Sequence, residues 1–372
     1  MGMKPEGRFS SRTYFAGPAQ RRALVIILLL FSGLGCAGPG PQLKAPALEL
    51  RAEAYPDPRD FYRYTPEEFS FSLATLEEKE AFRLHELRYP SPFKSGYPEN
   101  DLVQALYYEP LEGESLPAVI VLHPIGSGRA RLERWLCSEL AREGFAALLL
   151  AAPFHMKRKP RGFPWGGVRM VGEPELLMAA AHQALLDIRR AIDWLAERKR
   201  VDGRRLGILG VSMGAIVAEL AMGVDERLKA GVFVLGAGDI ARLIWESPIT
   251  FFQRLKLERK GLSEEALRER LALIEPLTFA RYIPPRKVFM VNGRTDLVIP
   301  PGCAEALWQA LGEPPIYWTW WGHYTSYLIK EKILSKSIGF LKGNLPHVEE
   351  KAAPQKRHVR GEFSSGGPSP YL

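Results

Sequence analysis

The stretch LGILGVSMGA, residues 206–215, places a serine between two glycines at the end of an apolar run. The run 206–210 has the pattern of a buried strand, and a helical pattern follows it. Ser212 therefore lies in a sharp strand-turn-helix connection, where the residues two before and two after it must be nearly free of side chains. Gly210 and Gly214 meet this requirement. With 34 glycines in the chain the triplet alone is weak, so its surroundings must show whether Ser212 is a nucleophile or only a serine in a glycine-rich turn.

Short apolar runs alternate with longer amphipathic patterns along most of the chain. The runs predict parallel strands at 116–123, 145–153, 205–211, 230–236, 287–293 and 315–321. The amphipathic patterns predict helices at 129–144, 173–200 and 324–342. This alternation is typical of an α/β fold, a mostly parallel central sheet with helices on both faces. An antiparallel pair, 81–90 and 101–110, is expected at one edge.

Residues 240–284 are more than a single crossover helix needs. Two helical patterns, 241–257 and 263–276, predict a small helical lid over the edge where parallel strands end. Ligands bind at that edge in open α/β sheets. An extended surface crossover is the alternative interpretation.

A serine hydroxyl becomes a good nucleophile when a histidine accepts its proton and a carboxylate orients that histidine. His323 follows the last apolar run, and Asp296 follows the run before it, so both are expected at the sheet edge that carries Ser212. Asp239, which follows an earlier strand, is the alternative acid. The sequence thus contains the parts of a Ser-His-Asp triad.

An acyl-transfer site also needs N–H groups for the oxyanion. One is expected from Met213, directly after the serine, and one from the loop VLHPIGSGR. Pro124 has no N–H, so Ile125 is the better donor in that loop. His123 is expected to brace the loop rather than to perform chemistry.

Four motifs, HPIG, GVSMG, GRTDLVIP and WGH, resemble those of α/β-hydrolases over about residues 80–343. The dienelactone hydrolase and acetyl esterase branch is the most similar. The resemblance implies Ser212 as nucleophile, Asp296 as orienting acid and His323 as base in a serine hydrolase that cleaves a carboxylic ester through an acyl-enzyme, without metal or organic cofactor. The proline in HPIG, where many relatives have glycine, is a departure.

A peptidase or acyltransferase with the same triad, or a catalytically silent binding lipoprotein of the cell envelope, are the alternative functions. The expected substrate is a small-molecule or lipid-like ester. Residues 155–170 contain five Lys or Arg residues and no acid, which suggests an anionic substrate or lipid headgroup near Arg158, Arg161 and Trp165. A solvated basic loop is the alternative.

Residues 21–36 read RRALVIILLLFSGLGC, and the apolar run is too short for a lasting membrane span. The segment resembles a bacterial lipoprotein signal. We therefore expect a signal peptide over 1–35, lipidation of Cys36, a Pro-rich tether to residue 79 and a disordered tail over 344–372. The lipid would anchor the protein to a membrane of the cell envelope; plain secretion and an uncleaved N-terminal anchor are the alternatives.

Composition is that of a globular protein, with 46% hydrophobic and 25% charged residues in 372. The net charge of +8 is partly carried by the signal segment and is too mild to indicate nucleic-acid binding. Cys137 and Cys303 are expected to be buried thiols. One folded domain is expected.

Overall fold

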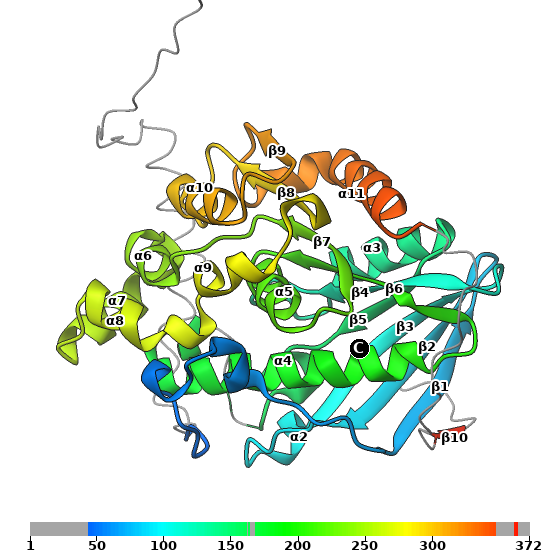
Figure 1. Ribbon diagram of the computed structural model, residues 1–372, viewed down its shortest axis with the longest axis horizontal. Coiled ribbons are helices and arrows are strands. Elements are labelled where there is room, and N and C mark those ends of the chain that lie inside the picture. The colour runs from blue at the N-terminus through cyan, green and yellow to red at the C-terminus, as the bar shows by residue number, and fades with distance from the viewer. Residues whose placement is uncertain (1–43, 162, 164–167, 347–360, 364–372) are drawn as a thin grey trace, which may run out of the picture. The chain divides into compact units, whose positions relative to one another are not determined.

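A sheet of ten strands forms the centre of the computed structural model, which describes residues 44–161, 163, 168–346 and 361–363 (Figure 1). The chain divides into two units, 1–38 and 39–372, of which the first lies outside the described residues. The strands are β1 (Phe71–Glu78), β2 (Phe82–Pro90), β3 (Leu102–Pro110), β4 (Leu116–Leu122), β5 (Ala146–Leu150), β6 (Val201–Val211), β7 (Leu228–Val234), β8 (Val288–Gly293), β9 (Ile316–Thr319) and β10 (Gly361–Phe363).

The strand order is β10-β1-β2-β3-β5-β4-β6-β7-β8-β9. Strands β5, β4, β6, β7, β8 and β9 are parallel, whereas β1, β2, β3 and β5 pair antiparallel. Both the mostly parallel sheet and the antiparallel pair at its side are therefore confirmed. The chain leaves β4 toward β5 on one side and returns to β6 on the other, which creates the switch point where open α/β sheets bind ligands.

Helices cover both faces of the sheet. On one face lie α4 (Pro174–Ala196), α5 (Met213–Val224) and α10 (Pro301–Ala310); on the other lie α3 (Arg131–Arg142) and α11 (Lys330–Asn344). In β4, Ile120 packs with the first group and its neighbours Val119 and Val121 pack with the second. This alternation explains why the central strands are apolar on both faces.

Short helices connect these elements. They are α2 (Pro98–Asp101), η1 (Ala52–Ala54), η2 (Pro58–Tyr62), η3 (Met156–Arg158), η4 (Val168–Gly172), η5 (Pro248–Thr250), η6 (Ala272–Ile274), η7 (Ala280–Tyr282), η8 (Pro285–Lys287) and η9 (Thr325–Ile329). No helix within the described ranges is both long and apolar enough to cross a bilayer.

The insertion expected at 240–284 is helical. It contains α6 (Ile240–Glu246), α7 (Phe251–Arg259), α8 (Glu264–Arg270) and α9 (Pro276–Phe279). The single helix expected over 241–257 is broken, because Pro248 cannot supply the backbone N–H that a helix interior needs. Leu257 and Leu267 are buried in the main core, so the insertion packs as part of the body, and its role as a lid stays a prediction.

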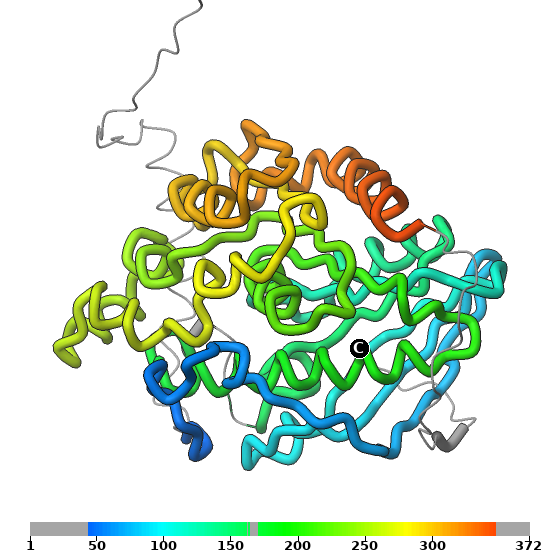
Figure 2. The backbone as a smooth tube through the Cα atoms, viewed as in Figure 1, coloured from blue at the N-terminus to red at the C-terminus, as the bar shows by residue number. Residues whose placement is uncertain are grey.

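The expectation of an unfolded tether up to residue 79 is wrong for its second half. Strand β1 joins the sheet, and η2 packs beside α4, where the blue end of the tube lies in Figure 2. Phe61 and Tyr62 are buried, and the Tyr62 hydroxyl donates to the carbonyl of Leu273 at 2.7 Å. Burial of these aromatic side chains thus orders a segment whose Pro-rich composition alone predicts an unfolded tether.

The tail expected to be disordered over 344–372 is ordered at two described places. Leu345, just after α11, is buried in the core, and β10 pairs with β1 in parallel.

Replacing Phe61 by Ala is expected to lower the free energy of unfolding by about 3–5 kcal/mol, because a large side chain only 2% exposed leaves a cavity. The matched control is Phe252→Ala, at a phenylalanine that is 52% exposed, with an expected change within about 0.5 kcal/mol. Urea unfolding measures both. Equal effects would contradict the assignment of residues 58–62 to the core.

Candidate active site

Ser212 occupies a strained turn between β6 and α5. Its φ of +55° and ψ of −119° lie outside the regions that L-residues favour, and its N–H donates to the carbonyl of Val234 at 2.8 Å. A Cβ at Gly210 would lie 2.1 Å from the carbonyl oxygen of Gly214, and a Cβ at Gly214 would lie 2.4 Å from that of Leu122. Only glycine permits these approaches, so both glycines are required by the turn.

The close approach of Gly214 to Leu122 puts the first turn of α5 against the end of β4. The loop that follows β4 carries Ile125, and the first residue of α5 is Met213. Among the described residues, neither of their N–H groups is recorded in a hydrogen bond. Both predicted oxyanion donors are therefore unpaired, and the N-terminus of α5 adds a field that favours negative charge.

Asp296 and His323 meet at the same end of the sheet. His323 Nδ1 lies 2.9 Å from Asp296 Oδ2. The other carboxylate oxygen, Oδ1, accepts the N–H groups of Val298 at 2.8 Å and Ile299 at 2.9 Å. These bonds fix the carboxylate, which in turn orients the imidazole so that Nε2 is left for another partner.

Two neighbouring loops bring this pair together. A Cβ at Gly293, the last residue of β8, would lie 2.2 Å from the carbonyl oxygen of Trp321. Thr295 Oγ1 donates to the carbonyl of Trp320 at 2.8 Å, and the N–H of Arg294 donates to that of Thr319 at 2.7 Å. The loop after β8 is thus joined to the loop after β9.

The alternative acid, Asp239, has another role. It caps α6 by accepting the N–H of Arg242, and it pairs with Arg268. His323 is therefore oriented by Asp296 and not by Asp239. Within the described part of the chain, no hydrogen bond is recorded between Ser212 and His323; in hydrolases without substrate this contact is often long.

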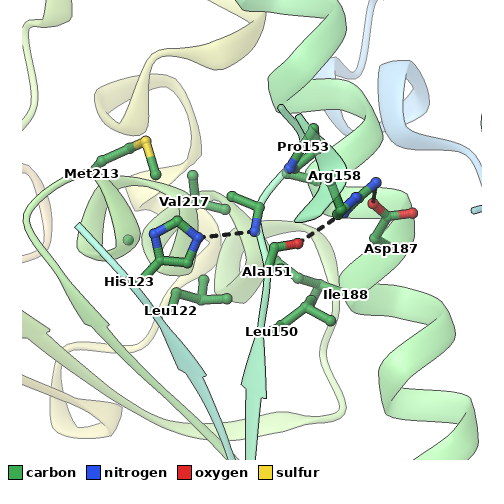
Figure 3. A pocket seen from close by; sticks show the side chains of 13 residues that line it. Leu122, His123, Leu150, Ala151, Pro153, Arg158, Asp187, Ile188, Met213 and Val217 are labelled. Carbon is green, nitrogen blue, oxygen red and sulfur yellow. Dashed lines mark hydrogen bonds and ion pairs between the residues drawn. The ribbon is translucent and has the colours of Figure 1, made fainter. Parts of the chain in front are cut away.

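His123 braces the loop after β4, as expected. Its Nδ1 donates to the carbonyl of Pro124 at 2.9 Å. Its Nε2 accepts the N–H of Ala152 at 3.0 Å, the contact drawn as a dashed line from His123 in Figure 3. Burial lowers the pKa of His123 to about 3, so the ring is neutral. Both nitrogens are occupied, which leaves none for proton transfer.

Arg158 does not have the place expected of a substrate-binding residue. It is fully buried, and its Nη2 lies 2.8 Å from Asp187 Oδ2 (Figure 3). It also donates to the carbonyls of Asn100 and Ala151. A guanidinium with these partners holds η3, α2 and α4 together and is not free to bind an anionic substrate.

A small cavity of about 20 Å³, room for roughly one water, lies behind the first turn of α5. Its lining is mainly apolar and includes Leu122, Leu150, Ile188, Met213 and Val217. Arg161 is exposed, whereas Trp165 and Cys36 lie outside the described residues. Cys137 and Cys303 are buried free thiols, as expected.

Among the residues described, no group of three His, Cys, Asp or Glu side chains is placed to hold a metal ion.

Comparison with known families supports the sequence interpretation. The profile of the family described as "Prolyl oligopeptidase family" matches residues 179–315, and that described as "Alpha/beta hydrolase domain containing 18" matches residues 63–241. The chain has the α/β-hydrolase fold. The predicted α/β-hydrolase architecture is thus confirmed.

Solved α/β-hydrolase structures show the same fold at low identity. The acetyl xylan esterase from Paenibacillus sp. R4 superimposes with a TM-score of 0.64 at 20% identity, covering 81% of this chain and 97% of its own. That from Thermoanaerobacterium sp. JW/SL YS485 gives a TM-score of 0.58 at 18% identity, with 78% and 95% covered. The acylaminoacyl peptidase of Pyrococcus horikoshii gives 0.56 at 16% identity, with 74% and 43% covered.

Two curated relatives match part of the chain. An uncharacterized protein of Mycobacterium tuberculosis H37Rv is 28% identical over 218 residues, 56% of this chain and 50% of the relative. The uncharacterized protein YcjY of Escherichia coli K12 is 26% identical over 171 residues, 45% of this chain and 52% of the relative. The chain thus spans about half the length of the curated relatives it matches.

Glu219 was not singled out from the sequence. It lies on α5 and is buried, and within the described structure neither of its carboxyl oxygens has a hydrogen-bond partner. Burial, and then the neighbouring carboxyl of Glu275, raise the pKa of Glu219 well above its usual value. Its spacing from Ser212 fits an ordinary helix face, so only the fold reveals an unpaired buried carboxyl on α5.

Replacing Gly210 by Ala is expected to lower the free energy of unfolding by about 2 kcal/mol or more, because the new Cβ would overlap the backbone of Gly214. Gly339→Ala in α11 is the matched control. Its Cβ would meet open space, and the change is expected to stabilise the protein by about 0.5–1 kcal/mol. Thermal unfolding of both variants checks this; a neutral Gly210→Ala would rule out the tight turn.

The raised pKa of Glu219 predicts a pH-dependent stability. The pKa of Glu219 is about 4.5 in the unfolded chain and higher in the folded protein. Between these two values the folded protein keeps the proton that the unfolded chain has released, so the free energy of unfolding falls as pH rises above about 4.5. The slope is at most about 1.4 kcal/mol per pH unit. Glu219→Gln is expected to flatten the decline above about pH 4.5, while Glu305→Gln, at an exposed position, leaves it unchanged. Parallel pH profiles for wild type and Glu219→Gln in urea unfolding would disprove the assignment.

Proposed function

We propose that this chain is a serine hydrolase that cleaves a carboxylic ester through an acyl-enzyme. The observation that carries the proposal is the 2.9 Å contact between Asp296 and His323 at the sheet edge where Ser212 forms a strained, glycine-flanked turn. The α/β-hydrolase fold supports it further, since such a turn positions the nucleophile in that fold.

In the proposed reaction, Ser212 Oγ attacks the ester carbonyl while Nε2 of His323 takes its proton. Asp296 stabilises the resulting imidazolium. The carbonyl oxygen becomes an oxyanion and accepts the N–H groups of Met213 and Ile125. When the tetrahedral intermediate collapses, His323 returns the proton to the departing alcohol. Water, activated by the same histidine, then releases the acid and restores Ser212.

The same parts serve amide cleavage and acyl transfer. The match to the prolyl oligopeptidase family over residues 179–315 favours a peptidase as the second candidate. It stays second because two structures named as acetyl xylan esterases cover 81% and 78% of this chain and nearly all of their own, whereas the peptidase structure is covered over 43% of its own length. A catalytically silent binding protein is the remaining alternative.

The proposed substrate is a small-molecule or lipid-like ester. The proposed location, a membrane of the cell envelope through lipid on Cys36, is supported by the sequence of residues 21–36 alone.

The proposal predicts one fluorophosphonate adduct per chain, seen by intact mass, and turnover of p-nitrophenyl acetate or butyrate. Ser212→Ala is expected to lose the adduct, and Ser212→Ala and His323→Ala to lose turnover by about 10⁴-fold or more. Asp296→Asn is expected to lose about 10³- to 10⁴-fold, because the imidazole loses its orientation.

Ser247→Ala is the matched control, since Ser247 is a buried serine between α6 and η5 whose Oγ has no hydrogen-bond partner among the described residues. It should keep both adduct and turnover. A folded wild type with neither adduct nor turnover would favour the binding protein. Turnover confined to peptide or acyl-acceptor substrates would replace the esterase by the second candidate.

A further inference from the structure

Five large side chains within nine residues are exposed beside His323. Trp320 is 78% exposed and Leu328 is 67% exposed. We call this group the aromatic rim; its members are Trp320, Trp321, Tyr324, Tyr327 and Leu328. Single exposed apolar residues are normal in proteins, whereas several large exposed side chains close together in one segment are typical of an interaction site.

The rim is held in a fixed arrangement. Thr295 Oγ1 donates to the carbonyl of Trp320, and the N–H of Gly322 donates to Thr325 Oγ1 at 2.9 Å. Ser326 Oγ then donates to the carbonyl of Gly322 at 2.8 Å. Because the backbone is already ordered, a partner would gain apolar contact at a low conformational cost.

Cations lie over rings of the rim and over aromatic rings next to it, and residues 314–330 contain no acidic residue. The guanidinium of Arg294 lies over the ring of Trp320 at 5.7 Å, and the ammonium of Lys330 lies over that of Tyr327 at 5.2 Å. Lys332, two residues after Lys330, is exposed, and its ammonium lies over the ring of Tyr317 at 5.4 Å. Glu331 is the neighbouring acid, and it pairs with Lys330.

We propose that the aromatic rim docks the protein on an anionic lipid surface. Trp and Tyr have an apolar body and a polar tip, which suits the boundary between headgroups and acyl chains. Arg and Lys beside them complement lipid phosphates. Protein interfaces are enriched in aromatic residues and arginine but depleted in lysine, so it is Lys330 and Lys332 beside the rings that favour a membrane over a protein partner.

Docking in this way would place His323, between Trp321 and Tyr324, against the bilayer. The proposal does not require the proposed hydrolase activity, because Ser212→Ala leaves every residue of the rim in place. It also differs from a lipid anchor at Cys36, since it concerns the folded domain.

The test is binding of the full chain to phosphatidylcholine vesicles with and without phosphatidylglycerol, by co-sedimentation. Wild type and Ser212→Ala are expected to bind the anionic vesicles better, and added salt should weaken that binding. The double variant Trp320→Ala/Leu328→Ala is expected to lose at least about tenfold in partition coefficient. Phe252→Ala, an exposed aromatic on α7, is the matched control and should bind as wild type. All variants share the same N-terminus, so differences report on the rim.

Quenching of tryptophan fluorescence by brominated lipids locates the contact. Trp320→Phe should lose part of the quenching and keep its folding, because the side chain is exposed. Equal binding by wild type and the double variant would overturn the proposal, as would equal binding to neutral and anionic vesicles. A dimer in the absence of lipid that the double variant dissociates would instead assign the rim to self-association.

Discussion

The contact of three backbone segments at Gly210, Gly214 and Leu122 is the constraint on which the candidate site depends. With a Cβ at either glycine the segments could not approach, since the new atom would lie 2.1 or 2.4 Å from a carbonyl oxygen. Their approach holds Ser212 at positive φ and places the N–H of Met213 beside the loop that carries Ile125. The local strain, of order 1–3 kcal/mol, is borne by a core in which β4, β6 and β7 are buried on both faces.

The titratable groups on the two sides of this turn differ in charge state and pairing. Here "behind" means the side of β4, η3 and α4, and "in front" means the side of the loops after β8 and β9. Behind it, the titratable groups are neutral or paired: His123 is neutral because burial lowers its pKa to about 3, and Arg158 is paired with Asp187. In front of it, Asp296 accepts two backbone N–H groups on one oxygen and contacts His323 with the other. Of these two histidines, His323 is therefore the one available for proton transfer, and His123 is not.

The central sheet and its order along the chain were predictable because each parallel strand is a short apolar run followed by a helical pattern. The positions of Ser212, Asp296 and His323 followed from the rule that functional loops leave the carboxyl ends of such strands. Strand β1 was missed because it lies near the sheet edge and Phe71 is its one buried residue, which leaves little hydrophobic signal. Arg158 was misjudged because its partner Asp187 comes from a distant helix. The unpaired carboxyl of Glu219 likewise depends on packing that no local pattern reveals.

The most direct test of the proposed site is a crystal structure of the protein after reaction with a fluorophosphonate. We expect phosphorus on Ser212 Oγ, with the phosphoryl oxygen within about 3 Å of the N–H groups of both Met213 and Ile125. Nε2 of His323 should face Oγ or the leaving-group position. Phosphorus on another residue, or a phosphoryl oxygen directed away from both N–H groups, would contradict the assignment of nucleophile and oxyanion donors.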